Sequence, residues 1–290
     1  MNSAVESMLA KYTGKTMEDR KNALKEIIQE IALCGLFRAG FFDKAAFYGG
    51  TALRIIHGLP RFSEDIDFSL LRKDADFDLG RYCTGVRNEL AAFGFDLAVA
   101  KKKKRGESAI QSAFIKGGTL VHLLKINAVK PPVAGVHRNE VLSIKFEIDT
   151  DPPAGAGYEI KYLLAPIPYS VRVFAIGSLF AGKLHAVLCR NWGSGRIKGR
   201  DLYDYVWFLS QKGPVNGTHL EARMRQTGHW QEQASLTADT LISLLEKRFR
   251  SINYTLAKRD ILPYLRNSAE LSLWSPDFFI GITKDGLKFE

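Results

Sequence analysis

The chain has 290 residues, 46% hydrophobic and 25% charged, which is the composition of a globular protein with one large core or two ordinary domains. No apolar run is long enough to cross a bilayer, and no basic segment followed by an apolar one opens the chain, so we expect a cytoplasmic protein with no membrane partner. The formal net charge of +10 favours a polyanionic partner such as nucleic acid.

The first 165 residues mix helix-like and strand-like segments. Apolar residues at helical spacing predict a helix over 18–40 and another over 78–94. A short strand at 45–48 enters a Gly-Gly turn, and the segment 51–58 follows as a short helix with Thr51 as its N-cap. Further strands are predicted at 65–71, 95–101, 108–116, 120–129 and 141–149.

The remaining residues are predominantly helical. Helices are predicted at 175–191, 200–213, 218–228, 238–252 and 255–267. We therefore expect an α/β (α+β) fold, with a mixed-sheet domain over 1–165 and a mostly helical domain over 166–290. The boundary between them is soft, since the helical half can also cap the sheet.

The densest positive charge is the run KKKKR at 101–105, which is followed by Lys116, Lys125 and Lys130. Such a run is either a solvated loop or a contact to the backbone of RNA or DNA. Charge alone indicates no sequence preference.

The segment RFSEDIDFSLL places two acids, Asp65 and Asp67, on a predicted strand. Residues i and i+2 of a strand point to the same face, so the two carboxylates would repel each other unless a cation neutralised them. Mg²⁺ takes one or two carboxylates together with substrate phosphates. The pair therefore indicates one edge of a metal–phosphate site, although the D-x-D pattern alone is weak evidence.

A glycine pair just upstream strengthens this interpretation. Gly49 and Gly50 let the backbone approach a ligand closely, and the helix that Thr51 opens offers unpaired N–H groups to phosphate oxygens. Ser63, two residues before Asp65, is a further candidate phosphate contact. The alternative is that the glycines only form a turn and that Ser63 caps it.

A third carboxylate is expected from the strand SIKFEIDT. Lys145, Glu147 and Asp149 share one face of that strand, and pairing beside 65–69 would bring either acid opposite Asp67. Glu147 is the first choice, because Asp149 can equally belong to the following turn.

These residues carry a family resemblance. The motifs GGTALR, RFSEDIDF, KLHAVLCR and KGRDLYD resemble those of the AbiEii/AbiGii-type nucleotidyltransferase toxins, within the DNA polymerase β-like nucleotidyltransferase superfamily. The resemblance runs over about 44–210, and LAKRDILPYL at 256–265 is similar to the C-terminal region of that family. It implies Mg²⁺-dependent transfer of a nucleoside monophosphate from an NTP to an acceptor hydroxyl, with tRNA or another RNA as acceptor. It also implies a cognate antitoxin protein and a role in phage defence.

The resemblance also gives roles to later residues. Lys183 and Arg190 are seven positions apart and so share a helix face, which by itself can be a solvated basic stripe. The family pattern makes Lys183 a contact to the triphosphate or pyrophosphate, with Arg190 as a second clamp. Asp201 matches a later acidic motif, as a catalytic acid or one that orients Lys183 or Arg190. For Asp204 a helix-dipole role is an equal alternative.

Two other classes of function stay open. One is a nucleotidyltransferase that modifies a protein hydroxyl, and the other is a binding module whose chemistry is lost. The residues do not indicate which NTP is used. The cysteines Cys34, Cys83 and Cys189 are far apart and include no CxxC pair, which argues for a reducing compartment and against a structural zinc site.

Overall fold

The computed structural model describes residues 2–14, 16–102, 109–126, 128–129, 133, 135–192, 197–265 and 267–290. The chain divides into two compact units. The first unit comprises Met1–His57, Phe62–Pro152 and Glu159–Val173, and the second comprises Gly58–Arg61, Pro153–Tyr158 and Phe174–Glu290. Over the described ranges, no helix combines the length and the apolar character needed to cross a membrane. The division into a mixed-sheet domain over 1–165 and a mostly helical domain over 166–290 stays a prediction.

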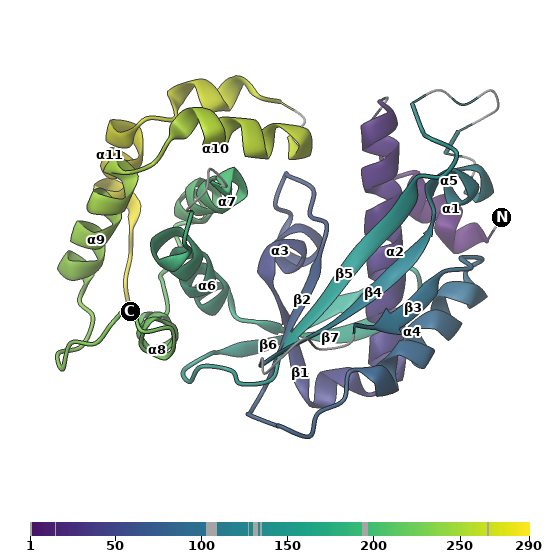
Figure 1. Ribbon diagram of the computed structural model, residues 1–290, viewed down its shortest axis with the longest axis horizontal. Helices are drawn as coiled ribbons and strands as arrows, with labels where there is room; N and C mark the ends of the chain where they lie inside the picture. The colour runs from purple at the N-terminus through teal and green to yellow at the C-terminus, as the bar shows by residue number, and fades with distance from the viewer. Residues whose placement is uncertain are drawn as a thin grey trace. The chain divides into compact units, whose positions relative to one another are not determined.

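A mixed seven-stranded sheet forms the centre of the first unit (Figure 1). Its strand order is β3-β4-β5-β2-β1-β7-β6. Two residues at strand ends, Tyr158 and Phe174, belong to the second unit. The strands are β1 (Ala45–Tyr48), β2 (Ile66–Leu70), β3 (Ala98–Lys101), β4 (Ile110–Gly118), β5 (Val141–Asp149), β6 (Tyr158–Leu163) and β7 (Tyr169–Phe174). This sheet confirms the predicted α/β (α+β) fold class.

The middle of the sheet is built from β1, β2 and β5. Strand β2 runs antiparallel to β1 and parallel to β5, so it has a strand on each side. Its alternate residues Ile66 and Phe68 are buried, and Phe68 packs edge-on against Phe41 and Phe146 at ring separations of 4.8 and 5.1 Å. The opposite face of β2 carries Asp67, as alternation along a strand requires.

The helices of the first unit are α1 (Ser3–Leu9), α2 (Met17–Arg38), α3 (Gly49–His57), α4 (Gly80–Ala92) and α5 (Thr119–Lys125). Helix α2 begins with a capping box between Thr16 and Asp19, and Gly40 beyond its end has φ +70°. Helices α2 and α4 pack side by side (Figure 1). The predicted helices at 18–40 and 78–94 are confirmed.

The strand predicted at 120–129 is wrong, because Thr119–Lys125 forms α5. Its buried residues are Thr119, His122 and Leu123, followed by Ile126. These positions have the i, i+3, i+4, i+7 spacing of a helix, and this face packs towards α2. The apolar run was too short for its period to separate a helix from a strand.

The second unit is helical, as predicted. Its helices are α6 (Ile176–Cys189), α7 (Gly199–Ser210), α8 (Gly217–Gln226), α9 (Ala238–Arg250), α10 (Tyr254–Ile261) and α11 (Pro276–Gly286). Helix α6 packs on α7 and α8, and α7 packs on α10 (Figure 1). The rings of Phe180 and Phe208 stack 4.5 Å apart between α6 and α7. Helix α11 was not predicted.

Candidate active site

The two central strands place an aspartate beside a glutamate. In the parallel pairing of β2 with β5, Asp67 is the direct partner of Glu147, whereas Asp149 is the partner of Ser69. Asp67, Glu147 and Asp149 are half-buried. Asp65 lies one residue before β2. The register therefore makes Glu147 the cross-strand neighbour of Asp67, one of the two options that the residues left open.

The first residue of α3 lies against the carboxylate of Asp67. Gly49 has φ +83°, and a Cβ at this position would lie 2.5 Å from Asp67 Oδ2. Only glycine leaves room for the carboxylate so close to the backbone. The glycine pair therefore brings the first turn of α3 next to Asp67, which is one of the acids that the sequence singles out.

Thr51 is buried inside α3 and is not its N-cap, because the helix begins two residues earlier, at Gly49. Its hydroxyl donates a hydrogen bond to the backbone carbonyl of Asp65. The N-cap prediction is wrong because the helix forms directly after β1, without an intervening turn. Thr51 thus fixes the backbone of Asp65 from inside the protein.

The segment before Asp65 is held by α2. Gln29 Nε2 donates hydrogen bonds to the carbonyl oxygens of Ser63 and Glu64, at 3.1 and 3.0 Å. Lys25 forms an ion pair with Glu64 at 3.1 Å. These contacts fix the backbone that carries Ser63, whose side chain is half-buried.

Glu147 and Asp149 have different surroundings. Glu147 accepts a hydrogen bond from Ser112 Oγ at 2.8 Å and pairs with Lys145 Nζ at 2.7 Å. Asp149 Oδ1 accepts from the backbone N–H of Asp151 at 3.0 Å, in the turn after β5. Asp149 thus bonds the turn after β5 and pairs with Ser69, while Glu147 is the cross-strand neighbour of Asp67.

The second unit gathers the later charged residues. Lys183 Nζ on α6 lies 2.7 Å from Asp204 and 3.6 Å from Asp201, both on α7. Arg190 pairs with Asp201 at 2.5 Å. Lys183 and Asp201 are largely buried, whereas 47% of the Arg190 side chain is exposed. Asp201 thus contacts both basic residues that the sequence singles out.

Arg61 is a charged residue of this cluster that sequence reasoning missed. It forms two hydrogen bonds of 2.6 Å to the two carboxylate oxygens of Asp204, and both side chains are buried. Burial alone would raise the pKa of Asp204, but the charges of Arg61 and Lys183 outweigh it and hold that pKa below its usual value. Arg61 is the first residue of the motif RFSEDIDF, and this position in the motif was the feature of the sequence that could have pointed to it.

The predicted residues therefore fall into two groups. Gly49, Asp65, Asp67 and Glu147 belong to the first unit, whereas Lys183, Arg190 and Asp201 belong to the second. In the basic run, residues 103–105 lie outside the described residues, as does Lys130, whereas Lys101 pairs with Asp78 at 2.5 Å.

The donors of the first group fit a hard divalent cation. Asp65, Asp67 and Glu147 offer carboxylate oxygens, which are the ligands that Mg²⁺ prefers. A Cβ at position 49 would collide with the Asp67 carboxylate, so glycine at this position lets that carboxylate keep its place beside α3.

Comparisons with known proteins agree with the motifs. The sequence profile of the family described as "Nucleotidyl transferase AbiEii toxin, Type IV TA system" matches residues 31–278. No curated protein matches the chain.

Solved structures similar to this chain include JHP933 from Helicobacter pylori, with 18% identity, a TM-score of 0.47 and coverage of 90% of this chain and 91% of that one. Another is an antigenic nucleotidyltransferase-like protein from Paracoccidioides brasiliensis, with 14% identity, a TM-score of 0.43 and coverage of 84% and 95%. Because the family match spans most of the sequence, the chain belongs to the AbiEii nucleotidyl transferase toxin family of type IV toxin–antitoxin systems and is a nucleotidyltransferase.

Proposed function

We propose that this nucleotidyltransferase moves a nucleoside monophosphate from an NTP to a hydroxyl group of tRNA or another RNA, with Mg²⁺ as cofactor. The observation that carries the proposal is the pairing of Asp67 with Glu147 on adjacent parallel strands, where the backbone of Gly49 meets the carboxylate of Asp67. Asp67 and Glu147 on neighbouring strands, with Asp65 two positions before Asp67, offer carboxylate oxygens to a metal that would be bound together with a triphosphate.

Asp65, Asp67 and Glu147 would hold the cation. When bound, Mg²⁺ supplies positive charge that offsets the charge of the phosphate oxygens. Thr51 and Gln29 keep the chain around Asp65 in place through backbone hydrogen bonds, so the carboxylates are positioned before substrate arrives.

The backbone N–H groups of Gly49 and Gly50 would donate to phosphate oxygens at the start of α3, where they have no partner within the helix. Ser63 is proposed as a further phosphate contact. In the reaction, the acceptor oxygen forms a bond to the α-phosphorus while the bond from that phosphorus to the pyrophosphate oxygen breaks. Glu147 would accept the proton that leaves the acceptor hydroxyl.

Lys183 and Arg190 remain proposed contacts to the triphosphate or to the leaving pyrophosphate. Asp201 supports this role because it contacts both basic side chains and so orients them. The salt bridge to Asp204 limits the rotation of the Lys183 side chain.

The acceptor is proposed from charge. A net charge of +10 and a sequence pI of about 9.4 favour approach to a polyanion, and tRNA is the polyanion that the family resemblance implies. Membership of a type IV toxin–antitoxin family also implies an antitoxin partner, and we propose that the activity serves phage defence.

The acceptor test uses purified chain, Mg²⁺ and each α-³²P-labelled NTP in turn, with total tRNA and a protein extract in the same reaction. The proposal predicts label in the RNA fraction, removed by ribonuclease and resistant to protease. Label in the protein fraction alone would replace RNA with a protein acceptor, and no label with any NTP would contradict the proposed transfer.

A further inference from the structure

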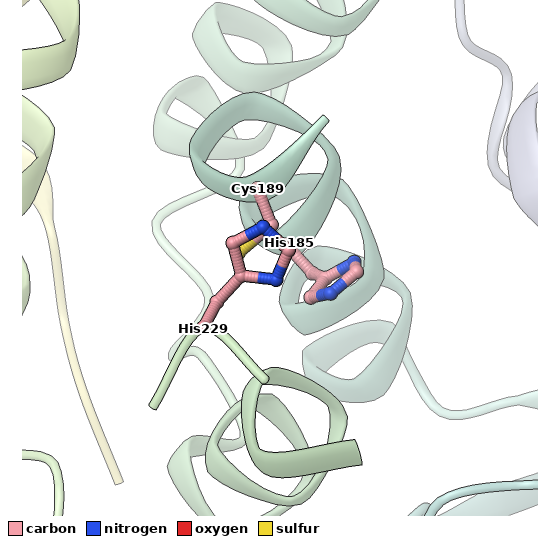
Figure 2. Close-up of side chains that lie close together, drawn as sticks. All are labelled: His185, Cys189 and His229. Carbon is pink, nitrogen blue, oxygen red and sulfur yellow. The ribbon is translucent and has the colours of Figure 1, made fainter. Parts of the chain in front are cut away.

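Two histidines and a cysteine meet in the second unit, apart from the charged residues described above. His185 and Cys189 are four positions apart on α6, and His229 lies three residues beyond the end of α8. One ligand atom from each residue can be chosen so that all three atoms lie within 4.8 Å of one another. Figure 2 shows the three side chains gathered between α6 and the segment that follows α8.

The sequence gives no hint of this cluster. The three cysteines are widely spaced and lack a CxxC pair, so the sequence argues against a structural zinc site. The spacing of His185 and Cys189 is that of neighbours on one helix face, but the third residue is 40 positions later and joins them only through packing of α8 on α6.

A threonine already holds the two imidazoles towards each other. Thr227 Oγ1 lies 2.9 Å from His185 Nε2 and 2.9 Å from His229 Nδ1, and it donates to the carbonyl oxygen of Arg223 at 3.0 Å. A neutral imidazole has one N–H and one lone pair, so each ring can keep a hydrogen bond and still offer a nitrogen to a metal. The Thr227 hydroxyl would orient both rings, a role that carboxylates, backbone carbonyls or water usually have for ligating histidines.

We propose that His185, Cys189 and His229 bind one divalent cation of the zinc type, with water as the fourth ligand. Around tetrahedral zinc, bonds of about 2.0–2.3 Å place ligand atoms roughly 3.5 Å apart. The limit of 4.8 Å exceeds this by about 1.3 Å, which side-chain rotations can close. His229 is exposed, so its side chain has room to make that adjustment.

The donor set distinguishes this cation from Mg²⁺. Two imidazole nitrogens and a thiolate are ligands for zinc and similar metals, whereas Mg²⁺ prefers carboxylate oxygens. Arg223 on α8 interacts electrostatically with His185, and its charge opposes a nearby cation. On binding a metal the Cys189 thiol would lose its proton, and the resulting thiolate would offset part of that repulsion, so the sulfur ligand is essential to the proposal.

A bound ion would join α6 to the segment after α8. Helix α6 also carries Lys183, two residues before His185 and therefore on a different side of the helix. The site would fix the position of this helix while leaving the contacts of Lys183 with Asp201 and Asp204 intact.

The test uses the tag-free full chain, freed of metal by a chelator and titrated with Co²⁺ and then with Zn²⁺. We expect one Co²⁺ per chain with a thiolate-to-cobalt charge-transfer band, displaced by Zn²⁺. Cys189→Ser should abolish the band. His229→Ala removes a direct ligand and should weaken Zn²⁺ binding at least about 100-fold, because even the loss of a residue that only supports a ligand costs up to about 100-fold. Because His229 is exposed, this variant should fold, and its thermal midpoint without metal should equal that of the wild type.

Matched controls are Cys83→Ser and His137→Ala, which change a cysteine and a histidine outside the cluster. Both should bind Co²⁺ and Zn²⁺ as the wild type does. The proposal is overturned if the wild type shows no charge-transfer band, or if His229→Ala binds Zn²⁺ as tightly as the wild type. Neither readout depends on nucleotidyl transfer.

Discussion

Arg61 and Asp204 are 143 positions apart in the sequence, yet they form a two-pronged ion pair with both hydrogen bonds at 2.6 Å and almost no solvent exposure. Asp204 also takes Lys183 at 2.7 Å. One buried carboxylate therefore neutralises two cations. This argues against the helix-dipole alternative for Asp204. An acid that only stabilises the helix dipole lies in the first turn and needs no burial, whereas Asp204 is buried and lies beyond the first turn of α7.

Asp204→Asn should therefore destabilise the protein strongly. The variant leaves Arg61 buried without its counter-charge, and breaking such a pair costs about 3–5 kcal/mol. The free energy of unfolding from urea denaturation at pH 7 measures this loss. Because the pKa of Asp204 is held below its usual 3.8, the stabilisation is present at neutral pH and is lost only as the pH falls through that lowered value.

Asp239→Asn is the control for this prediction. Asp239 lies in the first turn of α9 and is exposed, so its loss should cost less than about 1 kcal/mol. Equal losses from the two variants would mean that the buried pair contributes no more than a helix dipole.

Gly49→Ala should impair catalysis through Asp67. Its Cβ would lie 2.5 Å from Asp67 Oδ2, so the carboxylate must move. A displacement of about 1 Å can cost roughly 100-fold in rate, and kcat/KM for nucleotidyl transfer is the quantity to measure.

Gly58→Ala separates this contact from backbone strain. Gly58 has φ +74°, close to the +83° of Gly49, but a Cβ there meets no atom within 4 Å. Both variants should lose about 1–2 kcal/mol of stability from the left-handed backbone, while only Gly49→Ala should lose activity. Equal activity in the two variants would argue against a functional contact between Gly49 and Asp67.

Glu147→Gln and Asp149→Asn distinguish the two candidate third carboxylates. Since Glu147 is the cross-strand partner of Asp67, its loss should lower kcat by about 10³-fold, or about 4 kcal/mol of transition-state stabilisation. Asp149→Asn should change kcat by less than about tenfold, because its carboxylate serves the next turn. The reverse order of effects would assign the role to Asp149.

Glu30→Gln should remove a pH dependence from the stability of the protein. Burial raises the pKa of Glu30 from 4.5 to about 7, and Glu26 adds to the rise. The folded state therefore holds a proton that the unfolded chain releases, so stability falls by about 3 kcal/mol as the pH rises from 4.5 through 7. Thermal midpoints of wild type and variant across this range measure the difference. Parallel curves would show that Glu30 is ionised in the folded protein at these pH values.

Much of the fold follows from local patterns. Strand β5 was predicted at its observed bounds, and α2 was predicted from its apolar spacing and from Gly40. The acidic pair was also visible, because acids on a buried strand are rare. The error at α5 has a local cause as well, since its seven residues are consistent with either period.

The parts that the sequence left open depend on long-range pairing. The choice between Glu147 and Asp149 is a matter of strand register, which shifts by two residues without changing the buried face. The role of Arg61 depends on a partner 143 positions away, and His229 joins Cys189 only through helix packing. Neither distance leaves a spacing motif in a single sequence.

The most direct measurement of the central claim compares wild type with Asp67→Asn in single-turnover transfer from an α-³²P-labelled NTP to tRNA, with Mg²⁺. The account predicts labelled tRNA and an equal amount of released pyrophosphate, both reduced at least about 10³-fold in the variant, with thermal stability retained. Transfer by Asp67→Asn at the wild-type rate would contradict the assignment of this site.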